Sequence, residues 1–277
     1  VVHVFQTWGL QAALFAQGAG FSTTGLLADP FFSHHKGGEA NFQLTLQVGV
    51  ASVTYEELVP VIRRLAIEAG AKIMEIYNSD DFDVKLKSDD SPVTVADEAA
   101  DAIISAGLRA AFPDVMLVTE EQADSHKAKG DTFLIVDPLD GTKEFIAKND
   151  EFCINLALMD GNQVLLGFIF APVTGDYWWG SQQLGAFKGA DQAITANKVD
   201  RTIQVIGSRR FKGQGTWRDE LASAGYGFEQ VSQGSALKFC RIGDGRADLY
   251  PRLGPTCEWD TAAGQGIIEG AGGRLVT

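Results

Sequence analysis

Apolar residues recur at helical spacing in two stretches of the chain. In the first stretch, Thr54 and Glu57 stand at the spacing of a capping box, and apolar residues then follow every three or four positions. Thr94 and Asp97 show the same spacing ahead of the second stretch, which Phe112-Pro113-Asp114 ends. The hydrophobic pattern therefore predicts two amphipathic helices, over residues 55–77 and 95–111.

Short apolar runs bounded by turn residues predict a series of strands. The runs 152–159 and 163–170 are joined by Asp160-Gly161, which is typical of an antiparallel hairpin. Helices that alternate with strands and then meet an antiparallel block predict a layered α/β or α+β fold. Further strands are expected at 84–87, 115–118, 134–136, near 177–179 and 186–187, and at 202–207, and later helices at 217–224 and from residues 234 and 259.

Two carboxylates, Asp137 and Asp140, follow the predicted strand at 134–136. Pro138 is expected to end this strand, and a tight turn would then bring Asp140 back beside Asp137. Two adjacent carboxylates repel each other unless a cation or a shared proton lies between them, and Mg²⁺ prefers oxygen ligands of this kind. The other interpretation is a polar turn whose side chains cap backbone N–H groups, and this short pattern does not separate the two.

Four further acids stand at the ends of predicted elements. Asp97 falls in the first turn of the second helix, Glu120 and Glu121 follow the strand at 115–118, and Asp260 falls at the start of the last helix. Each of them has an ordinary explanation, as a helix cap or as an exposed loop residue. If side chains from these separate segments converge, oxygen ligands for two or three Mg²⁺ ions would come from Glu120, Asp137, Asp140, Thr142 and Asp260.

The composition narrows the classes of partner. Acidic residues outnumber basic ones by 36 to 23 among 277 residues, and the net charge of −13 argues against a nucleic-acid polymer or a membrane surface as partner. A small phosphorylated substrate stays compatible with that charge, because bound Mg²⁺ inverts the local field. Three cysteines without metal-ligand spacing favour a reducing compartment, and no membrane span or signal peptide is recognisable. We therefore expect a cytoplasmic protein, whose oligomeric state the sequence leaves open.

Five ordered motifs resemble the Mg²⁺-dependent, lithium-sensitive inositol monophosphatase superfamily over about residues 54–277. Within that superfamily, the chain is most similar to the bacterial 3′(2′),5′-bisphosphate nucleotidases. The resemblance implies a five-layered α-β-α-β-α fold with two lobes, usually treated as one unit. The motifs are S-P-V-T-V-A-D at 91–97, T-E-E at 119–121, D-P-L-D-G-T-K-E-F at 137–145, G-S-A-L-K at 234–238 and W-D-T-A-A-G at 259–264.

The resemblance implies a set of metal ligands. Glu120, Asp137 and the backbone carbonyl of Leu139 would hold a first ion. Asp137, Asp140 and Asp260 would hold a second ion, with Asp137 bridging the two, and Glu120 would also reach a weaker third ion. Leu139 and Asp260 are expected to face the substrate as well.

The resemblance also assigns residues to the attacking water and to the phosphate. Asp97 and Thr142 would orient and deprotonate the water. Glu121 would assist this pair without contacting the water itself. The backbone N–H groups of Gly141 and Thr142 would hold phosphate oxygens. No covalent phosphoenzyme is required, which agrees with the lack of an obvious nucleophile motif.

The subfamily rests on fewer residues. The run 142–145, Thr-Lys-Glu-Phe, resembles the nucleotidases, whereas inositol monophosphatases usually have Thr-Asn-Phe there. Ser235, Lys238 and Arg252 are expected at the substrate, where the two cations would contact the second phosphate of a bisphosphate. The implied reaction converts 3′-phosphoadenosine 5′-phosphate to AMP and phosphate, a step of sulfate assimilation. The alternatives are an inositol or sugar monophosphatase and a phosphonucleotide- or metal-binding protein without turnover.

The two ends of the chain depart from the family pattern. Residues 1–52 show no sustained periodicity and are treated as an extension of unknown structure, followed by the phosphatase domain at 53–277. Relatives usually continue past residue 277 through a further strand and helix, so the domain is expected to be short at that end. Because every motif lies beyond Ser52, deletion of residues 1–52 is expected to leave catalysis largely unchanged.

Overall fold

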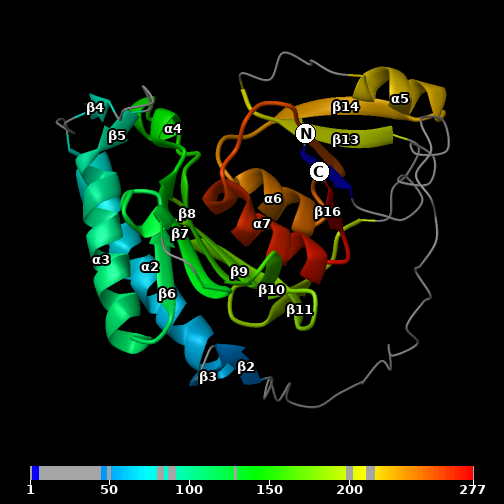
Figure 1. Ribbon diagram of the computed structural model, residues 1–277. Helices are drawn as coiled ribbons and strands as arrows, with labels where there is room; N and C mark the ends of the chain where they lie inside the picture. Colours follow the sequence, from blue (N-terminus) through cyan, green and yellow to red (C-terminus); the bar gives the residue numbers. More distant parts are fainter. Residues whose placement is uncertain are drawn as a thin grey trace.

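The computed structural model describes residues 2–5, 45–48, 51–79, 84–86, 92–127, 130–197, 202–209 and 216–276. Its elements form five successive layers, in which two sheets alternate with three layers of helices (Figure 1). This order confirms the layered α/β fold and the two lobes expected from the sequence. None of the helices in these ranges is long and apolar enough to cross a membrane.

A seven-stranded sheet forms the first lobe together with two helices. Helices α2 (Tyr55–Tyr77) and α3 (Val95–Ala111) cover one of its faces and have the predicted bounds. Their apolar sides pack on the sheet, where Ile62, Ile73 and Ile104 are fully buried. In spatial order, the strands are β12 (Gln192–Ile194), β11 (Gly185–Lys188), β10 (Asp176–Ser181), β9 (Gln163–Ala171), β8 (Cys153–Asp160), β7 (Thr132–Asp140) and β6 (Met116–Thr119).

Helices α6 (Leu237–Gly243) and α7 (Glu258–Gly270) lie on the opposite face of this sheet, between it and the second sheet (Figure 1). Small residues allow the close contact between α7 and β9. A Cβ added at Gly167 would lie only 2.1 Å from the carbonyl oxygen of Ala263, so only glycine permits this approach. This contact places the first turn of α7, which carries Asp260, next to the sheet.

The second lobe is a five-stranded sheet with α5 (Trp217–Ser223) beside its edge strand. The order of its strands is β14 (Gly227–Ser232), β13 (Thr202–Gly207), β15 (Leu249–Arg252), β1 (Val2–Phe5) and β16 (Arg274–Val276). Strand β1 comes from the N-terminal extension and pairs antiparallel with both β15 and β16. The sequence did not predict this strand, since residues 1–52 show no usable pattern.

Four short pieces complete the described chain. The hairpin of β2 (Thr45–Val48) and β3 (Ala51–Thr54) precedes α2, and the hairpin of β4 (Val84–Leu86) and β5 (Pro92–Thr94) precedes α3. The short helix α4 (Thr142–Ile146) follows β7, and a 3₁₀ turn, η1 (Ser125–Lys127), follows β6. The remainder of the extension lies outside the described residues.

The end of β7 differs from the prediction. The strand was predicted over 134–136, with Asp137 past its end and a tight turn beyond, but β7 continues to Asp140. Asp137 pairs with Asn155 and Asp140 pairs with Cys153, so three steps on β7 oppose two steps on β8. A bulge of one extra residue shifts the alternation of side chains by one position. The two carboxylates, which a regular strand would point to opposite faces, are therefore brought to the same side.

Candidate active site

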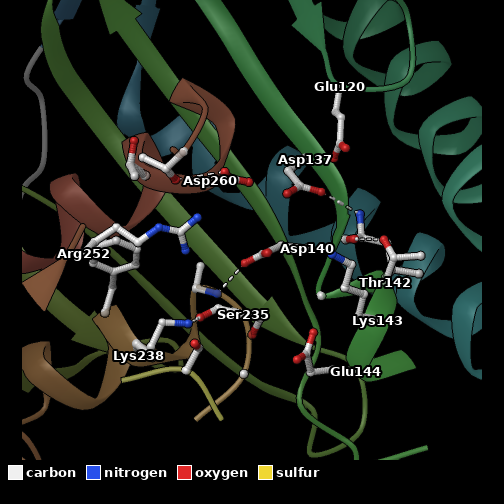
Figure 2. A pocket seen from close by; sticks show the side chains of 18 of the residues that line it. Glu120, Asp137, Asp140, Thr142, Lys143, Glu144, Ser235, Lys238, Arg252 and Asp260 are labelled. Atoms are coloured by element: carbon white, nitrogen blue, oxygen red, sulfur yellow. Dashed lines mark hydrogen bonds between the residues drawn. The ribbon is translucent and has the colours of Figure 1, made fainter. Parts of the chain in front are cut away.

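A cavity of about 310 Å³ opens between the two lobes, at the carboxyl ends of β6 and β7 (Figure 2). We call its two sides the acidic wall and the basic wall. The acidic wall belongs to the seven-stranded sheet and consists of Glu120, Asp137, Leu139, Asp140, Gly141, Thr142, Lys143 and Glu144. The basic wall comes from the second lobe, α6 and α7, and consists of Ser208, Gly234, Ser235, Ala236, Lys238, Phe239, Tyr250, Arg252, Thr256, Asp260 and Thr261.

Three carboxylates from two elements, β7 and α7, converge in this cavity. One carboxylate oxygen each of Asp137, Asp140 and Asp260 lies within 4.8 Å of the others. Glu120 is close to Asp137, because β6 and β7 are parallel neighbours and both end at this edge of the sheet. These positions confirm that the acids of separate segments meet, as the convergence hypothesis required.

The electrostatic cost of this cluster is visible in its pKa values. Burial, together with the charges of Glu120, Asp140 and Asp260, raises the pKa of Asp137 well above its usual range. Burial and the charge of Asp260 raise the pKa of Asp140 to about 7, although Lys238 opposes the shift. Carboxylates that disfavour ionisation in each other's presence are stabilised when a cation lies among them. The donor set, which consists only of oxygens, fits a hard divalent metal ion.

Two of the acids are held by the same local device. Asp97 and Asp260 both occupy position N3 of a capping box, at the start of α3 and α7. The Oδ2 atom of Asp260 accepts from the Cys257 N–H at 2.9 Å and from the Thr256 hydroxyl at 2.9 Å. The sequence placed Asp260 at the helix start, and the structure moves the N-cap back to Cys257. In each acid the Oδ2 atom thus binds the helix end, which leaves the Oδ1 atom for other partners.

Asp97 combines both interpretations that the sequence left open. Its Oδ2 atom accepts from the Thr94 N–H at 2.8 Å and from the Thr94 hydroxyl at 2.6 Å, as a helix cap would. Its Oδ1 atom accepts from the Thr142 hydroxyl at 3.1 Å, which joins it to the acidic wall. Burial raises the pKa of Asp97, and the bonds from Thr94 and Thr142 oppose the shift. The pair of Asp97 and Thr142 therefore exists, with Asp97 behind the wall and Thr142 on it.

Gly141 begins the turn that presents Thr142. Its φ of +100° lies in the left-handed region, where side chains are strained. A Cβ at this position would also lie 3.0 Å from the Glu151 carbonyl oxygen and 3.2 Å from the Cβ of Ser235. Both the conformation and the close approach of the basic wall require glycine here.

The cations of the basic wall are tied to the backbone and to an aromatic ring. Lys238 is buried, its ammonium donates to the Ser235 carbonyl oxygen, and it lies 5.1 Å from the centre of the Tyr250 ring. The Arg252 guanidinium donates to the Pro255 carbonyl oxygen at 2.6 Å and points into the cavity from β15 (Figure 2). Both cations thus face the carboxylates across the cavity, and their predicted contact with a second phosphate stays a prediction.

Sequence reasoning left one role untested and missed other residues. Glu121, predicted to assist the water indirectly, lies outside the cavity lining, and its role stays a prediction. Asn155 was missed, although its side-chain amide donates at 3.4 Å to Asp140 and to the Trp259 carbonyl oxygen. The available signal was one polar residue inside the apolar run Cys153–Leu158, where a buried amide needs partners. Ser208 is part of the basic wall, and Glu151 accepts a hydrogen bond from Gly234 of that wall. None of the sequence motifs indicated either residue.

Comparisons with known proteins agree with this geometry. A sequence profile of the inositol monophosphatase family matches residues 54–277. The 3′(2′),5′-bisphosphate nucleotidase CysQ of Escherichia coli (strain K12) is 38% identical over 218 residues, which cover 76% of this chain and 87% of the relative. CysQ of Buchnera aphidicola, subspecies Acyrthosiphon pisum, is 36% identical over 233 residues, 80% of this chain and 85% of the relative.

A solved structure extends the likeness from sequence to fold. The crystal structure of CysQ from Bacteroides thetaiotaomicron, described as a bacterial member of the inositol monophosphatase family, has a TM-score of 0.68 and 31% identity to this chain. The match covers 78% of this chain and 87% of that one. With the acid cluster and the layered fold, these matches place the chain in the inositol monophosphatase family.

Proposed function

We propose that the protein is an Mg²⁺-dependent phosphomonoesterase that converts 3′-phosphoadenosine 5′-phosphate to AMP and phosphate. The observation that carries the proposal is the cavity itself, in which the acid cluster around Asp137 faces Lys238 and Arg252. Relatives named 3′(2′),5′-bisphosphate nucleotidase, with up to 38% identity among those reported above, support the choice of a nucleotide bisphosphate.

Glu120, Asp137, Asp140, Asp260 and the carbonyl of Leu139 would hold two or three Mg²⁺ ions. When bound, these ions supply Lewis acidity for the attacking water and neutralise the charge that develops on the leaving oxygen. The donor chemistry and the raised pKa values of Asp137 and Asp140 support this assignment.

The proton of the attacking water has a route through this chain's own residues. The Thr142 hydroxyl donates to Asp97 and can accept from a water on its cavity side. Because burial raises the pKa of Asp97, this carboxylate is a stronger base than an exposed aspartate. As the water oxygen bonds to phosphorus, the bond from phosphorus to the 3′ oxygen breaks, and the water proton passes through Thr142 to Asp97. The departing 3′ oxygen takes up a proton from solvent and leaves as the 3′ hydroxyl of AMP.

The charge of the cavity matches a substrate with two phosphates. The residues that line it include five acids and three bases, which leaves an excess of two negative charges. Two divalent cations would turn this into an excess of two positive charges. The cleaved phosphate would lie against the acidic wall, where the N–H groups of Gly141 and Thr142 would hold its oxygens. Lys238 and Arg252 would then contact the second phosphate, with Ser235 beside it.

The alternative with its own support is an inositol or sugar monophosphatase. The family profile carries that name, and the acidic wall alone would serve any phosphomonoester. The two functions differ in what they demand of the basic wall, since a monophosphate has no second phosphate for Lys238 and Arg252.

Phosphate release from a substrate panel, measured with and without Mg²⁺, tests the proposal. We expect the highest kcat/KM with 3′-phosphoadenosine 5′-phosphate and no turnover in metal-free buffer. A preference for inositol or sugar monophosphates would support the alternative. Lack of turnover on every substrate, with binding of nucleotide retained, would indicate a binding protein.

The proposed reaction has a cellular context. It would remove a by-product of sulfate assimilation in the cytoplasm, and inhibition by lithium is expected for this class of enzyme. Cys153, Cys240 and Cys257 form no disulfide in the structure, which is compatible with a reducing compartment.

A further inference from the structure

Glu151 connects the two walls without lining the cavity. It lies just before β8 in the first lobe, its side chain is 14% exposed, and its Oε2 atom accepts from the Gly234 N–H at 2.8 Å. The same carboxylate accepts two bonds from Arg209, at 2.9 Å from Nε and 2.5 Å from Nη2. Arg209 follows β13 and Gly234 follows β14, so one acid of the first sheet reaches two neighbouring strand ends of the second.

The backbone at this junction is tightly packed. A Cβ added at Gly234 would lie 2.8 Å from the carbonyl oxygen of Glu151 and 2.8 Å from the Cβ of Glu151. Gly141 of the acidic wall also packs against this carbonyl oxygen and against Ser235. A shift of the Gly234 segment would therefore move atoms on both walls.

The turn that follows Gly234 needs such support. Ser235 has a φ of 52°, a left-handed conformation that is costly for a residue other than glycine. The next N–H, that of Ala236, donates to Oδ2 of Asp140, and the Ser235 carbonyl oxygen accepts from Lys238. Glu151 thus holds a strained turn whose two ends contact a proposed metal ligand and a proposed phosphate ligand.

We propose that Glu151 is a positioning residue for phosphate transfer, which anchors the turn Gly234-Ser235-Ala236 against Asp140 while Arg209 orients its carboxylate. The proposal rests on the proposed phosphatase activity but not on the identity of the nucleotide. Its strength lies in the bond to Gly234. That residue is buried and its N–H points at Glu151, so loss of the acceptor leaves a buried donor without its partner, whereas a half-exposed ion pair contributes little by itself.

Three variants separate the two contacts of Glu151. Glu151→Gln keeps an oxygen that can accept from Gly234, Glu151→Ala removes it, and Arg209→Ala removes only the orienting cation. Arg246→Ala is a matched control, because Arg246 makes the same two-bond pair with Asp244, at 2.8 Å and 2.5 Å, away from the cavity lining. The exposed fractions of the two arginines also match, at 53% for Arg246 and 52% for Arg209.

The first measurement is kcat/KM on whichever phosphomonoester the wild-type enzyme hydrolyses fastest. We expect Glu151→Ala to lose roughly 5- to 150-fold, the range for an unpaired buried donor. Glu151→Gln should recover most of that loss, Arg209→Ala should fall between them, and Arg246→Ala should match the wild type. Equal losses in the Gln and Ala variants, or in Glu151→Ala and the control, would overturn the proposal.

The second measurement is hydrogen exchange of the backbone amides, which needs no substrate. In Glu151→Ala the amides of Gly234 and Ala236 should exchange faster than in the wild type, and in Arg246→Ala they should not. Unchanged protection in Glu151→Ala would contradict the anchoring role even if turnover fell. If the wild-type protein hydrolysed nothing, the proposed function would fail, while the exchange data would still decide the role of Glu151.

Discussion

The two walls of the cavity are built in different ways. The acidic wall stands on regular structure, since Glu120, Asp137 and Asp140 lie at or just past the ends of two parallel strands that β8 supports from the side. The basic wall stands on a turn, in which Ser235 adopts a left-handed conformation and Lys238 bonds back to the chain. A strand ladder fixes carboxylates that must share a cation, whereas a turn can adjust to the rest of a substrate.

This difference assigns separate tasks to the walls. Changes on the acidic wall should remove chemistry from every substrate alike, because all phosphomonoesters present the same reacting group. Changes of the cations on the basic wall, Lys238 and Arg252, should alter the choice among substrates, whereas a change of Asp260 should act like one on the acidic wall. The following predictions use this contrast, and they run from the largest expected effect to the smallest.

Asp140→Asn should cause the largest loss of turnover. It weakens a proposed metal ligand in the middle of the acid cluster, and metal ions supply several kcal/mol of transition-state stabilisation, so we expect about a 1,000-fold loss in kcat. The loss should be the same for bisphosphate and monophosphate substrates. Saturating Mg²⁺ in a steady-state assay provides the test, and near-wild-type kcat under these conditions would remove Asp140 from the metal site.

Asp97→Ala should lower kcat by about 100-fold with a smaller change in KM, because it removes the acceptor of the proposed proton route. The matched control is Glu57→Ala, which deletes the N3 acid of the capping box of α2, outside the cavity lining. Both variants lose a cap, but only Asp97 also binds Thr142. Similar kcat values in the two variants would reduce Asp97 to a helix cap.

Lys238→Ala should change substrate choice. A charge-assisted hydrogen bond contributes about 1.5–3 kcal/mol, which predicts a loss of roughly 10- to 150-fold in kcat/KM for the bisphosphate. A monophosphate should lose less, although the charge of Lys238 also acts on Asp140. The ratio of kcat/KM values for the two substrates isolates the second phosphate. An unchanged ratio would leave the nucleotidase assignment to the run 142–145 and to the relatives alone.

Deletion of residues 1–52 should have the smallest effect on kcat. None of the described residues of this segment lines the cavity, but β1 lies between β15, which carries Arg252, and β16. We therefore expect unchanged kcat with a lower melting temperature, a cost that the sequence alone did not predict. Val4→Pro is the sharper variant, since proline cannot donate within a central strand. Equal melting temperatures of wild type and both variants would show that β1 contributes nothing to the sheet.

The same contrast explains what the sequence could predict. The two long helices were recognisable because capping boxes and apolar periodicity are local signals, and each acid of the acidic wall stood at the end of a patterned element. The bulge at Asp137 and Asp140 was mistaken for a turn, because the pairing of β7 with β8 decides it. Pro138 ended the strand in the local interpretation, but the ladder continues past it.

The basic wall was far less predictable from its own residues. Its members come from loops after β13 and β14, from α6, from β15 and from α7, segments that only the packing of two lobes brings together. Lys238 and Arg252 were named through a family resemblance, and nothing in the pattern indicated Glu151 or Ser208. The left-handed conformation of Ser235 also has no local signature, since the residue before it is the glycine.

The most direct test of the central claim is the thermal stability of the protein with and without Mg²⁺, at pH 5 and pH 8. In metal-free protein, the pKa of Asp140 is raised from its ordinary value of 3.8 to about 7. A raised pKa means that the folded state holds this proton more tightly than the unfolded state. The resulting stabilisation of the folded state is fully present below the ordinary pKa and is lost as the pH rises through the raised pKa. The acid cluster should therefore destabilise the metal-free protein at pH 8, and Mg²⁺ should restore stability there.

In Asp140→Asn, one acid no longer titrates and one ligand is weakened, so both the loss on raising the pH and the gain from Mg²⁺ should be smaller than in the wild type. We predict a clear rise of the wild-type melting temperature on addition of Mg²⁺ at pH 8 and a much smaller rise in Asp140→Asn. Equal responses of the two proteins, or no response of the wild type, would contradict the claim that these carboxylates form a metal site.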